Sequence, residues 1–167
     1  MSLTDRDIKL LEKIITPLKL IDYEDRLVGG DLTGDGVQFS DEKTTGVADT
    51  DIEVLAKTIE PGIAGNLLWG EFGLTAAFRA TTTTADLVWK WQARNKGGTW
   101  VDLHPAVTET DIGTSWVGRT RQGFAKIVAN FNGVPFDVRL LLSCNEANAG
   151  KGRVKSSSYA RAVFQAS

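Results

Sequence analysis

Hydrophobic and polar positions alternate with a period of two through most of the chain after residue 50. The alternation is clearest over residues 67–80, 87–93 and 136–144. Such a pattern places one face of a β-strand against a core and the other toward solvent. Shorter runs at 52–59, 99–103, around Trp116, at 125–131 and at 160–164 bring the total to about eight strands. With glycine-rich turns between them, these strands predict an antiparallel β-sandwich of jelly-roll type.

The amino-terminal residues follow a helical spacing instead. Ile8, Leu11 and Ile15 lie three or four residues apart, and Pro17 disfavours helical geometry at the residue before it. A helix of about twelve residues is marginal by itself. We therefore expect an N-terminal helical arm whose apolar face packs either on the rest of this domain or on a neighbouring chain.

The chain divides in composition at about residue 50. Residues 1–50 carry eleven Asp or Glu and six Lys or Arg, whereas residues 51–167 carry ten acids and thirteen bases. Residues 22–50 are rich in Asp, Gly and Thr without periodicity, which predicts a long loop with at most one short strand. We expect an arm over 1–50, made of the helix and an acidic loop, followed by a sandwich domain over 51–167.

The charge pattern argues against several classes of partner. Basic residues gather late, at Lys151, Arg153, Lys155 and Arg161, with Arg119 and Arg121 earlier, and we interpret them as mostly one solvated strand face. Neither half shows the concentrated basic face of a nucleic-acid-binding protein. No window approaches eighteen apolar residues, so we expect no membrane partner. The amino terminus lacks the pattern of a secretory signal, which predicts a chain made inside the cell or exported by another route.

One segment has the spacing of a calcium-binding loop. Asp31, Thr33 and Asp35 occupy positions 1, 3 and 5, with glycine at position 6 and Glu42 at position 12. Thr33 stands where Asp or Asn is usual, and two glycines precede the loop where a helix would have to end. An Asp-Gly turn explains the segment better, so we predict no metal and no cofactor.

Residues for catalysis are scarce. His104 is the single histidine and Cys144 the single cysteine, and Cys144 lies on the inward row of a predicted strand. No nucleophile elbow and no phosphate-binding loop accompanies them. The sequence therefore predicts a protein that is not an enzyme.

Four of the five tryptophans fall into two groups by their position in the alternation. Trp89 and Trp91 share a row with Leu87 and Ala93, which is typical of core residues. Trp69 and Trp100 alternate out of phase with their apolar neighbours, which makes them candidates for exposed contact residues. The alternative is that they cover the edge of the sandwich beneath the N-terminal helix.

Residues 89–103, WKWQARNKGGTWVDL, resemble a hairpin of discoidin-like and jelly-roll sandwiches, in which an aromatic strand, a short glycine turn and a G-T-W strand pack together. Together with residues 135–140 and 152–158, they also resemble bacteriophage virion accessory proteins, whose sandwich follows an N-terminal arm. This resemblance implies a non-enzymatic capsid decoration or other virion structural protein, assembled in the host cytoplasm.

These observations predict a structural interaction protein located in the virion. The expected partners are the major capsid protein or other virion proteins, together with further copies of this chain in a homo-oligomer. The expected contact residues are Ile8, Leu11, Ile15, Trp69 and Trp100. The alternative is a carbohydrate-binding module in which Trp69 or Trp100 stacks on a glycan.

Overall fold

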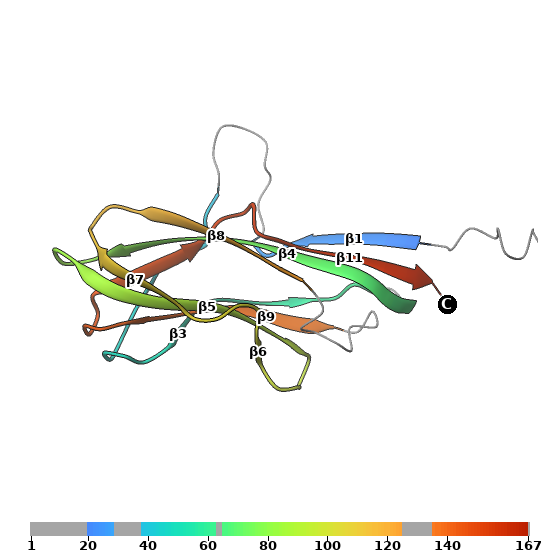
Figure 1. Ribbon diagram of the computed structural model, residues 1–167, viewed down its shortest axis with the longest axis horizontal. Helices are drawn as coiled ribbons and strands as arrows, with labels where there is room; N and C mark the ends of the chain where they lie inside the picture. Colours follow the sequence, from blue (N-terminus) through green and yellow to red (C-terminus); the bar gives the residue numbers. More distant parts are fainter. Residues whose placement is uncertain (1–19, 29–37, 63–64, 125–134, 167) are drawn as a thin grey trace, which may run out of the picture.

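The computed structural model describes residues 20–28, 38–62, 65–124 and 135–166, and within these ranges every regular element is a β-strand (Figure 1). In chain order the strands are β1 (Leu20–Arg26), β2 (Lys43–Thr44), β3 (Ile52–Ile59), β4 (Gly65–Ala80), β5 (Ala85–Asn95), β6 (Val101–Asp102), β7 (Val107–Ile112), β8 (Val117–Phe124), β9 (Phe136–Cys144), β10 (Gly150–Val154) and β11 (Tyr159–Ala166). They form two stacked antiparallel sheets, so the predicted β-sandwich is confirmed. No helix able to span a membrane occurs among the described residues.

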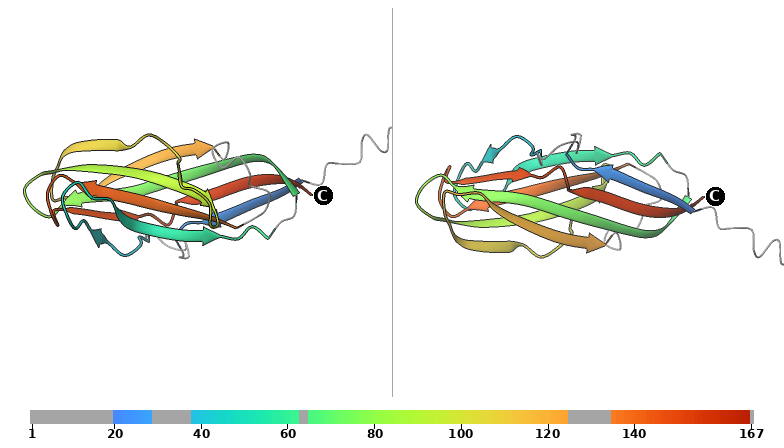
Figure 2. Two further views of the ribbon diagram at one scale, coloured as in Figure 1. Left: turned by 90° about the horizontal axis from the view of Figure 1, so that it is seen from below. Right: turned by 90° about the horizontal axis from the view of Figure 1, so that it is seen from above.

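The pairing of the strands follows the order of a jelly roll. In the first sheet β10 and β11 both lie along one side of β4, β8 lies along the other, and β1 and β2 flank β11 and β10. In the second sheet β9 lies between β3 and β5, and β6 and β7 share the far side of β5. Each sheet thus has four strand positions. As in a jelly roll, the chain crosses between the sheets at every step from one position to the next, except from β5 to β6 and β7, which pair with β5 in the second sheet. Figure 2 shows the opposite faces of the sandwich.

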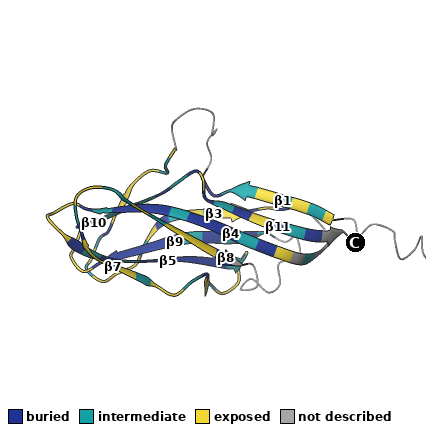
Figure 3. Ribbon diagram, turned by 45° about the horizontal axis from the view of Figure 1, so that its top comes forward, coloured by how far each residue is buried: buried dark blue, intermediate teal, exposed yellow. Residues whose placement is uncertain are grey.

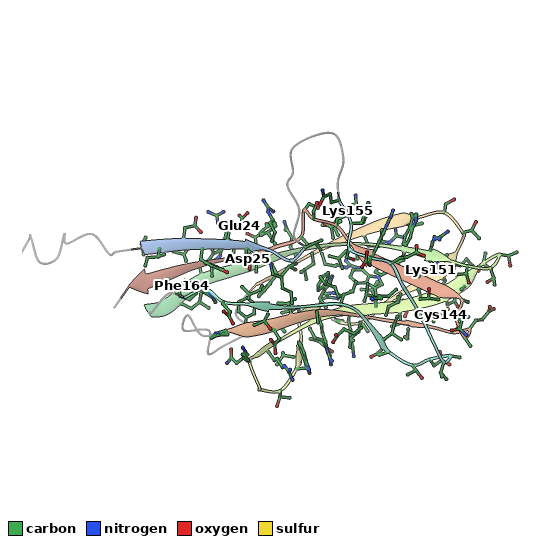
Figure 4. All side chains as sticks on the ribbon, turned by 180° about the vertical axis from the view of Figure 1, so that it is seen from behind. Glu24, Asp25, Cys144, Lys151, Lys155 and Phe164 are labelled. Carbon is green, nitrogen blue, oxygen red and sulfur yellow. The ribbon has the colours of Figure 1, made fainter. Side chains whose placement is uncertain are left out.

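The segment before residue 50 differs from the expectation. The predicted helix with Ile8, Leu11 and Ile15 lies outside the described residues, and the described residues supply no helical arm. Part of the segment expected to be a loop is built into the first sheet, because all seven residues of β1 pair with β11. The acidic residues of β1 alternate between the two faces. Glu24 points outward, while Asp25 pairs with Lys57 of β3 at 3.0 Å and so links the two sheets (Figure 4).

The predicted inward rows form the core between the sheets. Trp89 and Trp91 are at most 1% exposed, and the central inward residues of β4, β5, β9 and β11 are also buried (Figure 3). The buried rows are Phe72, Leu74, Ala76 and Phe78 on β4, Leu87 and Ala93 on β5, Phe136, Val138, Leu140, Leu142 and Cys144 on β9, and Ala160, Ala162 and Phe164 on β11. Alternation alone located these faces correctly. The row predicted over residues 125–131 lies outside the described residues.

Two glycines on β10 allow the sheets to approach closely. A Cβ atom at Gly150 would lie 2.7 Å from Leu87 Cδ2, and one at Gly152 would lie 2.9 Å from Leu142 Cδ2. Both distances are shorter than packed carbon atoms allow. The inward positions of β10 are therefore occupied by side chains from the second sheet.

At two places, a pair of short strands shares one position in a sheet, and a side chain between them bonds to the backbone of the neighbouring strand. Between β10 and β11, Ser158 Oγ accepts a hydrogen bond from the Thr75 N–H (2.8 Å) and donates one to the Thr75 carbonyl (3.0 Å). Between β6 and β7, His104 Nε2 accepts a hydrogen bond from the N–H of Trp91 (3.2 Å). The backbone groups at these breaks are partly buried, where a missing partner costs about 1–3 kcal/mol.

Candidate interaction surfaces

Three apolar side chains share the outer face of the first sheet at the end where β1 begins and β11 ends. Leu20 is 54% exposed, Trp69 is 41% exposed, and Val163 is half-buried. Val163 lies directly opposite Trp69 in the register, and Leu20 lies on the next strand. We call these residues the terminal patch. Trp69 is exposed as its position in the alternation predicted, and its role as a contact residue stays a prediction.

A charged pair borders the terminal patch. Arg161 donates to both carboxylate oxygens of Asp22, at 3.2 and 2.8 Å, and its guanidinium carbon lies 5.7 Å from the centre of the Trp69 ring. The hydrogen bonds from Arg161 lower the pKa of the Asp22 carboxyl. The patch therefore combines an apolar centre with a charged rim, an arrangement typical of protein interfaces.

Trp100 lies on the outer face of the second sheet and is half-buried rather than fully exposed. Two guanidinium carbons approach the centre of its ring, that of Arg94 at 4.3 Å and that of Arg139 at 4.0 Å. Such contacts contribute about 0.5–2 kcal/mol each. The indole is therefore held in place by two strands that lie beside each other in the sheet, β5 and β9.

Polar side chains surround Trp100 and hold the arginines. Arg94 donates to Asp137 at 2.9 Å, and Arg139 donates twice to the side-chain carbonyl of Gln92, at 2.9 and 2.8 Å. The amide of Gln92 in turn donates to Asp102 at 2.6 Å. This network, which we call the Trp100 cluster, presents a fixed ring beside amide and carboxylate groups.

The two side chains considered for catalysis have structural surroundings. Nδ1 of His104 lies 2.7 Å from the carbonyl of Pro105, so the accepted bond at Nε2 leaves Nδ1 as the donor. Burial lowers the pKa of His104 and raises that of the Cys144 thiol, which favours neutral forms of both. The thiol is buried in the core, and the imidazole completes a strand pairing.

The candidate calcium loop is only partly visible. Asp31, Thr33 and Asp35 lie outside the described residues. Glu42 is described and forms ion pairs with Lys151 and with Arg79, the latter at 3.5 Å. Across the described ranges, no group of three or more His, Cys, Asp or Glu side chains is arranged to hold a metal ion.

The basic residues of the second half do not form one solvated face. Lys151, Arg153 and Arg161 point outward from the first sheet, as expected. Arg119, on the opposite face of β8, donates twice to Glu109 of β7 at 2.8 Å and thereby joins the edges of the two sheets. The hydrogen bonds from Arg119 lower the pKa of Glu109.

No family model matches the sequence, and no curated protein matches it. Several solved structures are similar to this chain, all at low identity and with TM-scores below 0.5. The infectious bursal disease virus VP2 subviral particle is 10% identical with a TM-score of 0.46, over 88% of this chain and 37% of that one. The xylan-binding domain CBM22-1 of Paenibacillus barcinonensis Xyn10C is 15% identical with a TM-score of 0.41, over 87% of this chain and 95% of that one.

The chain spans about a third of the length of another similar structure, that of the Gt strain of infectious bursal disease virus, at 9% identity and a TM-score of 0.44. The similar structures thus include both viral capsid proteins and carbohydrate-binding modules. Similarities at this level assign no activity to this chain, and the sandwich fold rests on the strand pairings described above. The resemblance to bacteriophage virion accessory proteins stays a prediction.

Proposed function

We propose that this protein is a non-enzymatic virion structural protein of the capsid decoration type, which binds a particle surface and further copies of itself. The observation that carries the proposal is the terminal patch. Trp69 and Leu20 are large apolar residues left exposed on one face at one end of an otherwise well-packed sandwich. Aromatic residues in such positions supply much of the binding energy of protein interfaces.

The position of the terminal patch supports this proposal. Residues 1–19 lead directly into Leu20 in the sequence, so the apolar positions Ile8, Leu11 and Ile15 precede the first residue of the patch along the chain. Segment and patch together supply two contact regions per copy. Many weak contacts repeated over a particle add through multivalency, so each interface can be small. The surroundings of His104 and Cys144 support a role without catalysis.

The location of the protein tests the proposal directly. Particles purified on a density gradient from the virus or organism that encodes the chain are examined by quantitative mass spectrometry. We expect many copies per particle, with loss of the protein from particles when residues 1–18 are deleted. This deletion leaves β1 intact, which a deletion through residue 21 would not. Finding the full chain only in unassembled fractions would overturn the proposal.

A carbohydrate-binding module is the second candidate, and the Trp100 cluster favours it. A ring fixed by Arg94 and Arg139 loses little entropy when a sugar stacks on it, and the exposed carboxylate of Asp102 can accept from sugar hydroxyls. A glycan array tests this reading. Binding that is lost in Trp100→Ala, while the circular dichroism spectrum is retained, supports it. If no glycan on the array binds the protein, the carbohydrate-binding function is excluded.

A further inference from the structure

Four basic residues gather on the outer face of the first sheet, away from the terminal patch. Arg79 and Lys151 lie opposite each other in the pairing of β4 with β10, Arg153 follows on the same face, and Lys155 comes directly after β10. Figure 4 shows Lys151 and Lys155 on this side of the molecule. We call these four residues the cationic patch.

Aromatic rings hold the arginines of the cationic patch in place. The guanidinium carbon of Arg153 lies 3.6 Å from the ring centre of Phe39 and 3.9 Å from that of Trp116. The guanidinium carbon of Arg79 lies 5.0 Å from the same Trp116 ring. A stacked guanidinium is already ordered, so it loses little freedom when it forms hydrogen bonds to a ligand.

The charge of the cationic patch is incompletely compensated. In the described part of the chain, Glu42 is the carboxylate that pairs with the patch, through Lys151 and Arg79. The Nε atoms of Arg79 and Arg153 are buried and have no hydrogen-bond partner among the described residues. Burial lowers the pKa of Arg153, the attraction of Glu42 opposes this effect, and repulsion from Arg79 adds to it. An anion at the surface would compensate the remaining charge of the two guanidinium groups.

Short polar side chains continue the face beside the cationic patch. Thr75 and Thr120 lie opposite each other on β4 and β8, with their hydroxyl oxygens 3.2 Å apart. The next pair toward the patch is Ala77 with Gly118, so no long side chain stands between the hydroxyls and the basic residues. Thr75 and Arg79 are four residues apart on one strand, about 13 Å at the usual rise.

We propose that the cationic patch and the neighbouring threonine pair bind an acidic polysaccharide. The forks of Arg79 and Arg153 match the carboxylate of a uronic acid unit, and the threonine hydroxyls meet the hydroxyls of the following sugar units. The paired threonine hydroxyls favour a ligand rich in hydroxyl groups over single-stranded nucleic acid, which is bound largely through base stacking.

Calorimetric titration of the full chain with oligogalacturonate in 0.15 M salt tests the proposal. The variant Arg153→Gln/Lys155→Gln should bind at least about ten-fold more weakly, since charge-assisted hydrogen bonds contribute about 1.5–3 kcal/mol each. The control Lys96→Gln/Arg121→Gln removes the same charge from exposed positions elsewhere and should bind as the unchanged protein does. Arg153→Lys, which keeps the charge and loses the fork, should give an intermediate affinity.

Several outcomes would overturn the proposal. Oligogalacturonate fails to bind, or the control variant weakens binding as much as the patch variant does. Equal binding of polyglutamate or single-stranded DNA, with the same response to the variants, would show nonspecific attraction of polyanions. Near-UV circular dichroism checks the fold of each variant. If Arg153→Gln perturbs it, Lys151→Gln/Lys155→Gln replaces that variant, because these lysines carry the charge without being stacked between two rings.

Discussion

The replacement Trp69→Ala gives a sharp test of self-association through the terminal patch. Trp69 points outward from β4 and leaves 41% of its surface exposed. Its removal deletes little of the core, because the inward row of the same strand is intact. We therefore expect the variant to fold and to associate less well.

The size of the effect follows from the exposed area of the side chain. A tryptophan offers up to about 250 Å², of which the exposed 41% amounts to about 100 Å². At about 25 cal/mol per Å², burial of this area in an interface contributes about 2.5 kcal/mol. The expected weakening is up to about 60-fold in the dissociation constant for each tryptophan that becomes buried.

Sedimentation equilibrium over a range of protein concentrations measures this change. Val47→Ala is the matched control, because Val47 is also an exposed apolar residue, 71% accessible, in the loop between β2 and β3 and away from the terminal patch. The control should associate as the unchanged protein does. Equal association of Trp69→Ala and the unchanged protein would refute the role of the patch.

Two further predictions concern stability. Gly152→Ala should lower the free energy of unfolding by about 1–3 kcal/mol in urea titrations, because its Cβ would overlap Leu142, and an unchanged midpoint would contradict the close approach of the sheets. Burial lowers the pKa of His104 below its ordinary value of 6.5, so the unfolded chain binds a proton near pH 6 that the folded chain does not. Stability should therefore fall as the pH drops from about 6.5 toward the folded-state pKa and stay constant just above this range. As His104 is the single histidine, His104→Gln should abolish this slope, and a persisting slope would exclude His104 as its cause.

The strands that the sequence predicted are those with a strong apolar row. β5 and β9 lie in the middle of the second sheet, each between neighbours on both sides, and their inward residues are all apolar. Burial of one face then enforces a strict period of two. The inward faces of these strands were predictable for the same reason.

Two of the strands that the sequence missed, β1 and β10, have a charged residue or glycines at some of their inward positions. β1 places Asp25 on its inner face, where Lys57 compensates the charge, and an acidic run of this kind is typical of a loop. β10 has glycines at inward positions 150 and 152, where the second sheet fills the space. Their place in the fold depends on partners distant in the sequence, such as Lys57 for Asp25 and Leu87 for Gly150, which a local pattern does not contain.

The surroundings of the candidate sites also depend on residues that are distant in the sequence. Alternation predicted that Trp100 faces outward, but its partial burial comes from Arg139 on a neighbouring strand. The late basic residues were visible as a cluster in the sequence. Their concentration around Phe39 and Trp116 was not visible in the sequence, because it requires the pairing of β10 with β4 and the bridge between Phe39 and Lys155.

The position of β11 has a consequence for how the chain folds. β11 lies between β1 and β4, and the contact between Asp22 and Arg161 spans 139 residues. During synthesis, β1 has no neighbour in the first sheet until residues 159–166 have left the ribosome. Folding should therefore be slow for the size of the chain and should occur after synthesis of the sandwich rather than during it. A chain shortened before residue 159 would leave the edges of both β1 and β4 open to pairing with other molecules, and aggregation is its expected fate.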